Sequence, residues 1–168
     1  RHLGVRPRTA LGQNFLVDAN VRDRLLDLAE ALPGETVLEV GPGLGVLTEG
    51  LLSRGVRVEA VEKDPRLAAF LQRRFADEAR LQVHEGDALQ WVDTWEERRR
   101  AQVISNLPYA IGSRLLAGWA LTARPPDFLL VTLQEDVVHR MIAPPGTRAR
   151  GTLSVLMQRT DGDAPNFR

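Results

Sequence analysis

Short apolar runs of strand length alternate with segments of helical period along this 168-residue sequence. The runs rich in β-branched residues predict strands, and the segments between them carry apolar residues at helical spacing. Such alternation is typical of an α/β fold in which helices flank a mostly parallel sheet. The predicted strands are Thr36–Val40, Val56–Val61, Leu81–His84, Ala101–Ser105 and Phe128–Leu133, with a further strand expected at Thr152–Gln158.

Capping and stop signals predict where the helices lie. The first helix is expected to begin at Asp18 or Asn20 and to end at Pro33-Gly34. Its expected buried face is Val21, Leu25, Leu28 and Leu32. Asp64-Pro65 starts another helix, because proline fits the first helical position, and that helix is expected to bury Leu67, Phe70, Leu71 and Phe75. The remaining predicted helices are Val46–Ser53, Ser113–Thr122 and Glu135–Ile142.

The composition excludes several classes of protein. The absence of cysteine excludes disulfides, thiolate zinc sites and a cysteine nucleophile. Phe128–Val131, the longest notable apolar stretch, is too short to span a bilayer, and no apolar run follows the basic start, so a cytoplasmic protein is expected. The histidines, His2, His84 and His139, lack metal-ligand spacing, so no metal is expected. The net charge of zero gives no support for a nucleic-acid partner, although Arg1, Arg6 and Arg8 make the N-terminus basic.

Polar and glycine residues follow the first three predicted strands. The segment Glu39–Gly45 is a glycine-rich turn, where the backbone can bend sharply and approach a ligand. Glu62 follows the second strand and can accept hydrogen bonds from both ribose hydroxyls of an adenosine. Asp87 follows the third strand and is placed to receive the adenine amino group. Because parallel strands end at one edge of the sheet, these residues predict a nucleoside-cofactor site.

The glycine spacing favours S-adenosylmethionine over a nicotinamide dinucleotide. The dinucleotide fingerprint is G-x-G-x-x-G, but the third glycine here is Gly45, and Val46 stands where that fingerprint needs glycine. A negative charge on Glu39, just before the turn, would disfavour a pyrophosphate and tolerate a cationic sulfonium and ammonium.

Asn106-Leu107-Pro108-Tyr109 follows the fourth predicted strand and is expected to carry the chemistry. The amino nitrogen of adenine is a poor nucleophile because its lone pair is delocalised into the ring. The side-chain oxygen of Asn106 and the backbone oxygen of Leu107 or Pro108 can accept its two N–H bonds and aim the lone pair at a methyl group. Pro108 stiffens the loop, and Tyr109 offers a face on which an extruded base can stack.

The motifs, in order and spacing, resemble the ribosomal RNA adenine dimethyltransferase family over nearly the whole chain, and most closely its bacterial small-subunit (16S) branch, which is linked to kasugamycin resistance. The residues that carry the resemblance are Leu11–Leu16, Glu39–Gly45, Glu62, Gly86–Leu89, Asn106–Tyr109 and Gln134–Val138. The resemblance implies a class I (Rossmann-like) S-adenosylmethionine-dependent methyltransferase fold. It also implies transfer of two methyl groups to N6 of each of two adjacent adenines in 16S rRNA, during assembly of the small ribosomal subunit.

The resemblance also assigns site residues. Asn14 and Leu16 would close over the methionine end of the cofactor, Glu62 would bind ribose, and Asn106 would touch both cofactor and target amine. The implied cofactor-binding set is Gln13, Asn14, Leu16, Gly41, Gly43, Glu62, Asp87, Ala88 and Asn106. Residues 1–168 would form the catalytic domain, with residues 1–17 as an N-terminal arm. The last part of this domain and the family's small C-terminal helical domain are expected to be missing, and a monomer is expected.

Three alternatives stay open at this point. A non-enzymatic RNA- or DNA-binding factor could keep the same fold, and a dinucleotide oxidoreductase could use the same strand ends. Relatives that modify large-subunit RNA tend to have Ile where Leu107 stands. Lys63 departs from the family, which often has an apolar residue after the ribose-binding acid, and this departure is expected to have little effect.

Overall fold

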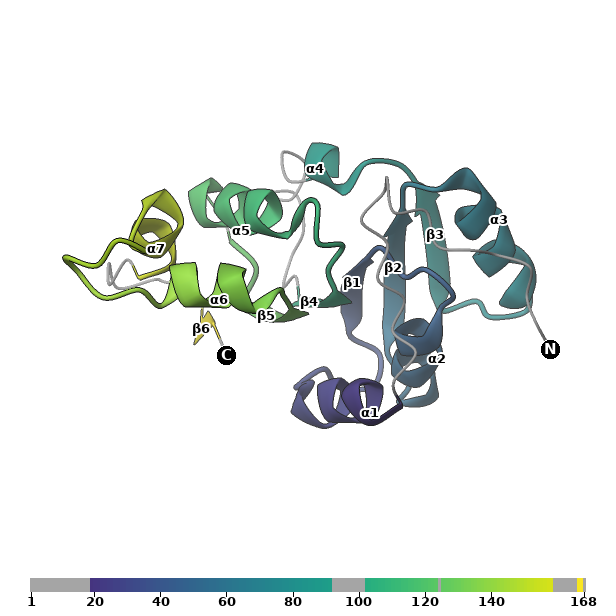
Figure 1. Ribbon diagram of the computed structural model, residues 1–168. Helices are drawn as coiled ribbons and strands as arrows, with labels where there is room; N and C mark the ends of the chain where they lie inside the picture. Colours follow the sequence, from purple (N-terminus) through teal and green to yellow (C-terminus); the bar gives the residue numbers. More distant parts are fainter. Residues whose placement is uncertain (1–18, 92–101, 124, 159–165, 168) are drawn as a thin grey trace.

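The computed structural model describes residues 19–91, 102–123, 125–158 and 166–167. Within these ranges the strands form one parallel sheet in the order β3-β2-β1-β4-β5-β6 (Figure 1). The strands are β1 (Thr36–Val40), β2 (Arg57–Glu62), β3 (Leu81–Glu85), β4 (Gln102–Asn106), β5 (Phe128–Thr132) and the two-residue β6 (Asn166–Phe167). The predicted α/β class with a parallel sheet is confirmed.

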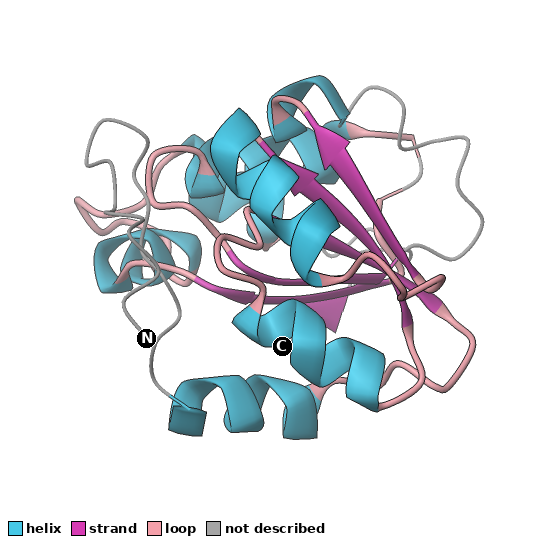
Figure 2. Cartoon of the chain, turned by 90° about the vertical axis from the view of Figure 1, so that its right-hand side faces the viewer, coloured by secondary structure: helices cyan, strands magenta, loops and turns pink. Residues whose placement is uncertain are grey.

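Helices cover both faces of the sheet (Figures 1 and 2). The helices are α1 (Ala19–Leu28), α2 (Val46–Ser53), α3 (Pro65–Arg74), α4 (Ala88–Trp91), α5 (Gly112–Leu121), α6 (Glu135–Met141) and α7 (Thr152–Met157). Apolar residues of α1 and α2 pack on one face of the sheet, and those of α4, α5 and α6 pack on the other. Helix α7 lies against α5 and α6.

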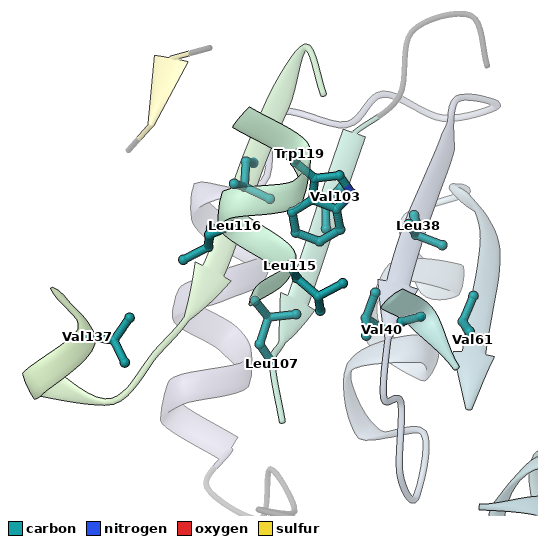
Figure 3. Packing of buried hydrophobic residues seen from close by; sticks show 11 residues of the cluster. Leu38, Val40, Val61, Val103, Leu107, Leu115, Leu116, Trp119 and Val137 are labelled. Atoms are coloured by element: carbon teal, nitrogen blue, oxygen red, sulfur yellow. The ribbon is translucent and has the colours of Figure 1, made fainter. Parts of the chain in front are cut away.

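Alternate residues of the strands supply the two cores, as the pleat of a strand requires. Val37 and Ile104 belong to the cluster with α1 and α2, whereas their neighbours Leu38 and Val103 belong to the cluster with α5. Figure 3 shows this second cluster, to which Trp119 of α5 and Val103 of β4 both belong. Burial on both faces explains why β4 and β5 are rich in apolar residues at consecutive positions.

Strands β1 and β4 separate where they approach their carboxyl ends. Their ladder pairs Val37 with Gln102 and Leu38 with Val103, whereas β4 and β5 pair along all five residues. Beyond the ladder, the Ser105 hydroxyl bridges the gap, donating to the Val40 carbonyl at 2.6 Å and accepting from the Val40 N–H at 3.2 Å. The chain continues from β1 to β2 on one side and from β4 to β5 on the other, so this gap is the topological switch point, where α/β sheets bind ligands.

The expected first helix is too long and its buried face is partly wrong. Helix α1 ends at Leu28, and the side chains that it buries are Leu25 and Leu26. Leu28 is 45% exposed and Leu32 is 64% exposed. Two hydrogen bonds hold the loop after α1. The Leu32 N–H donates to the Glu35 carboxylate within the loop, and the Gly34 N–H donates to the Gly55 carbonyl, which lies after α2.

The strand expected at Thr152–Gln158 is also wrong, because Thr152–Met157 is helix α7. Ser154 is fully buried, accepts from the Gly151 N–H at 3.1 Å and donates to the Arg140 carbonyl of α6. Leu153 and Met157, four residues apart, pack against the core while Val155 is exposed. Burial at this spacing is helical. None of the helices described here is long and apolar enough to cross a membrane.

Candidate active site

Strands β1, β2 and β3 lie side by side in parallel (Figure 1). The glycine turn, Glu62 and Asp87 at their carboxyl ends therefore lie at one edge of the sheet. The Gly41 N–H donates to the Val61 carbonyl at 2.9 Å, and the Gly86 N–H donates to the Glu62 carbonyl at 3.0 Å. These bonds fix the start of each loop to the end of the neighbouring strand. Asn106 is the last residue of β4, on the other side of the switch point.

Gly41 joins the loop after β1 to the loop after β4. Its φ is 65°, in the left-handed region, and a Cβ built on it would lie 2.7 Å from Cγ of Pro108. A side chain at this position would therefore force the two loops apart. Gly43 and Gly45 also have positive φ, and a Cβ on Gly45 would collide with Leu71. The glycines are thus explained by close approach as well as by turn geometry.

Glu62 links β2 to the glycine turn. Its side chain is 5% exposed; Oε2 accepts from the Gly43 N–H at 3.2 Å and Oε1 accepts from the Asp64 N–H at 2.9 Å. Burial raises the pKa of Glu62, and the backbone hydrogen bonds from Asp64 and Gly43 oppose that rise. Each carboxylate oxygen has a second lone pair, so both can accept a further hydrogen bond from a ligand.

Glu39 was expected to be negatively charged and so to disfavour the pyrophosphate of a dinucleotide, but its surroundings in the structure keep it neutral. Its side chain is 2% exposed on the α2 side of β1, where the Thr48 hydroxyl donates to Oε2 at 2.6 Å. Burial, with a smaller contribution from the charge of Glu62, raises the pKa of Glu39 from 4.5 to about 8. The group is therefore mostly protonated at neutral pH, and the argument from its negative charge is wrong for the ligand-free protein.

Replacing Glu39 with glutamine is expected to stabilise the protein in alkaline solution. Because the folded-state pKa is raised, the stability that the protonated group contributes is complete below about pH 4.5 and is lost as the pH rises towards about 8. Glu39→Gln keeps an oxygen for the Thr48 hydroxyl and cannot ionise. Between pH 5 and pH 8 we expect the free energy of unfolding of the wild type to fall by about 3 kcal/mol relative to that of Glu39→Gln.

Urea unfolding at pH 5 and pH 8 checks this expectation. Glu49→Gln, on an exposed carboxylate of α2, is the matched control and should follow the wild type at both pH values. An equal difference between Glu39→Gln and the wild type at the two pH values would contradict the protonated state assigned to Glu39.

Asp87 is engaged on both of its oxygens. The Leu89 N–H at the start of α4 donates to Oδ1 at 3.1 Å, and the Lys63 ammonium lies 2.7 Å from Oδ2. The hydrogen bond from Lys63, followed by that from the Leu89 N–H, holds the pKa of Asp87 below its usual value. Ala88 is buried in the core beside α5. Lys63, for which the sequence suggested little effect, is therefore a direct partner of a predicted site residue.

Asn106 is oriented from the neighbouring strand. The Thr132 hydroxyl of β5, its register partner, donates to Oδ1 of Asn106. The Pro108 carbonyl accepts from the N–H groups of Ile111 and Gly112, both at 3.2 Å. The Leu107 carbonyl is therefore the better second acceptor of the two that the sequence left open. The Leu107 side chain is buried in the core, and Tyr109 is 43% exposed.

The structure does not test the predicted residues of the N-terminal arm. Gln13, Asn14, Leu16 and the arm at 1–17 lie outside the described residues. The ring of His84 packs edge-on against the ring of Trp91, with 4.5 Å between the ring centroids. In the part of the chain that the structure describes, no group of three acidic, histidine or cysteine side chains could hold a metal ion.

Sequence reasoning missed Ser105 and Thr132. Ser105 had a signal, since it is a small polar residue at the end of the apolar run Val103-Ile104. The contact of Thr132 depends on which strand lies beside β4.

The parallel sheet, its switch point and the loops at that edge define a class I S-adenosylmethionine-dependent methyltransferase fold. The profile of the family described as ribosomal RNA adenine dimethylase matches residues 4–160. The chain belongs to this family, which confirms the resemblance read from its motifs.

Curated relatives and solved structures agree with this assignment. The "Ribosomal RNA small subunit methyltransferase A" of Aromatoleum aromaticum is 44% identical over 156 residues, covering 91% of this chain and 57% of the relative. The protein of that name from Geobacter metallireducens is 41% identical over 160 residues, covering 92% and 58%. The chain thus spans less than two thirds of the length of these relatives.

Two crystal structures have a similar fold. A dimethyladenosine transferase from Plasmodium falciparum superposes with a TM-score of 0.72 at 25% identity, covering 86% of this chain and 52% of that one. The 23S rRNA methyltransferase ErmE gives a TM-score of 0.62 at 26% identity, covering 76% and 50%.

Proposed function

We propose that this chain binds S-adenosylmethionine at the switch point. We further propose that the protein carrying it methylates N6 of two adjacent adenines in 16S rRNA of the immature small ribosomal subunit. The observation that carries this proposal is the contact of Gly41 with Pro108, because it places the glycine turn directly against the Asn-Leu-Pro-Tyr loop. A cofactor lying over the turn would then have its reactive end beside Asn106.

The residues fit an adenosine ligand. Glu62 offers carboxylate oxygens for two ribose hydroxyls, and Asp87 offers an acceptor for the adenine amino group. Gly41 lets the turn approach the Pro108 loop, and Gly43, with positive φ, lets the backbone of the turn come close to a ligand. The buried Ala88 gives the base an apolar wall. Gln13, Asn14 and Leu16 would close over the methionine end as part of the arm at 1–17.

The chain's own groups would act mainly by positioning the target amine. S-adenosylmethionine, when bound, supplies an electrophilic methyl group on a sulfonium. The oxygens of Asn106 and Leu107 accept the two N–H bonds of the adenine amine, which concentrates its lone pair on nitrogen. Tyr109, exposed beside them, offers a stacking face for the extruded base. Positioning of this kind can supply much of the rate of a reaction between two held partners.

The small-subunit assignment is favoured over large-subunit RNA by the relatives. Those at 41–44% identity carry the small-subunit name, whereas the neighbour named for 23S rRNA is 26% identical. Leu107 agrees with this choice. We also propose that residues 1–168 belong to the catalytic domain, and that the protein acts as a monomer in the cytoplasm, where ribosomal subunits are assembled.

Methyl transfer to purified subunits tests the function. The protein carrying this chain is mixed with methyl-labelled S-adenosylmethionine and small subunits that lack the modification. We expect label at N6 of two adjacent adenines of 16S rRNA. Label confined to large-subunit RNA would reassign the substrate, and binding of the cofactor without any transfer would favour a non-enzymatic RNA-binding role.

A further inference from the structure

Lys63 is the only lysine in the sequence, and it lies between two residues of the candidate site, Glu62 and Asp87. It directly follows Glu62 at the end of β2, and its Nζ lies 2.7 Å from Oδ2 of Asp87, across from the end of β3. The Lys63 side chain is 57% exposed and that of Asp87 is 25% exposed. The Lys63 ammonium is therefore bound to Asp87, while much of the side chain remains accessible to solvent.

The neighbouring charges explain why Lys63 pairs with Asp87. Glu62 is taken up by the N–H groups of Gly43 and Asp64. Asp64 is held by the Arg66 guanidinium, at 2.6 Å from Oδ2. Asp87 is a partly exposed carboxylate that the Lys63 side chain reaches, and the hydrogen bond from Lys63, with a smaller contribution from the charge of Arg114 on α5, lowers its pKa.

The two oxygens of Asp87 have different partners. Oδ1 accepts the Leu89 N–H and so caps the start of α4. Oδ2 is the oxygen on which an adenine amino group would bind, and Lys63 occupies it in the ligand-free protein. Oδ2 has more than one lone pair, but a second donor would have to approach this oxygen beside the Lys63 ammonium, which lies 2.7 Å away, so the adenine amino group and the ammonium compete for it.

We propose that Lys63 is an internal competitor for the adenine subsite: its ammonium holds Oδ2 of Asp87 until the nucleobase of the cofactor displaces it. This inference rests on the proposed function, because that function assigns Asp87 to the adenine ring. The consequence is a weaker hold on both the cofactor and its demethylated product, which favours product release. A surface ion pair is weak, so the competition is expected to change affinity by about two- to fivefold.

Calorimetry with S-adenosylhomocysteine tests the competition. Lys63→Met keeps the unbranched stem and removes the charge, and we expect it to bind the ligand about two- to fivefold more tightly than the wild type. Lys63→Arg, which keeps a cation, should resemble the wild type. Arg22→Met removes a cation from a surface pair on α1, at 2.7 Å from Asp23, and should also leave affinity unchanged.

Salt provides a second arm of the same experiment. Screening weakens the Lys63–Asp87 pair, so wild-type affinity should rise between about 50 and about 500 mM salt, while Lys63→Met should show no such rise. Equal or weaker binding by Lys63→Met would overturn the inference while leaving the proposed function intact. Absence of binding by the wild type and every variant would overturn both.

The reactivity of the amine gives a readout that is independent of affinity. Mass spectrometry of the peptide that contains Lys63 reads the acetylation of this amine by an amine-reactive reagent. Displacement of Lys63 from Asp87 frees the ammonium, so the ligand should increase the acetylation rate at this residue. Unchanged or slower acetylation in saturating S-adenosylhomocysteine would contradict displacement.

Discussion

Asn106→Ala is expected to lower the rate of methyl transfer by about two to three orders of magnitude, the size of effect seen when a single preorganised hydrogen-bonding group is removed from an active site. Its oxygen is held at the end of β4 by the Thr132 hydroxyl and has a second lone pair for the target amine. The loss should fall mainly on kcat, because the contact with the amine strengthens as the nitrogen becomes tetrahedral.

Single-turnover rates and calorimetry with S-adenosylhomocysteine separate the two effects. Cofactor affinity of Asn106→Ala should fall much less than the transfer rate. Equal losses in rate and affinity would contradict the role given to the side-chain oxygen.

Thr132 provides a graded companion to this variant. Thr132→Val keeps the shape of the side chain and removes the hydroxyl, so Asn106 stays but loses its orientation. We expect transfer to slow by about three- to tenfold, consistent with one lost neutral hydrogen bond, and Thr132→Ser to restore it. A serine variant as slow as the valine variant would show that packing, and not the hydroxyl, is what matters at this position.

Glu62→Ala is expected to weaken S-adenosylhomocysteine binding by about 10- to 100-fold, the effect of losing hydrogen bonds to a charged group. The carboxylate would hold the ribose hydroxyls, and it also accepts from the N–H groups of Gly43 and Asp64. Its removal therefore loosens the glycine turn as well as the sugar contacts. Glu62→Gln should lose less affinity, because one amide oxygen can replace one carboxylate oxygen.

Isothermal titration measures this loss, with Glu59→Gln on the same strand as control. Because the pKa of Glu62 is raised in the ligand-free protein, affinity in the wild type should decline on acidification sooner than for an ordinary glutamate. Unchanged binding by Glu62→Ala would remove this residue from the site.

The sheet was predictable because the central strands β1, β4 and β5 are largely buried and carry mostly apolar residues. The edge that carries the site was predictable for a related reason, since parallel strands all end there. Thr152–Met157 was not, because Leu153, Val155 and Met157 alternate as in a strand. In the structure the segment packs on α5 and α6, and Ser154 hydrogen-bonds to the Arg140 carbonyl; the sequence pattern contains neither contact.

The partners of the site residues were harder to predict than the residues themselves. Thr132 reaches Asn106 because β5 lies beside β4, and Lys63 reaches Asp87 because β2 lies beside β3. Strand order is a property of the whole fold, so local spacing does not reveal such pairs. The predicted charge of Glu39 was wrong for a different reason. Burial beside Thr48 raises its pKa, and the sequence shows that the residue is a glutamate but not that it is buried.

A crystal structure of the protein with S-adenosylhomocysteine tests the central claim most directly. The account predicts the ligand at the switch point between β1 and β4, with its ribose hydroxyls on Glu62, its adenine amino group on Asp87, and its sulfur facing Asn106. A ligand bound away from this edge, or one that leaves Glu62 and Asp87 without contact, would contradict it.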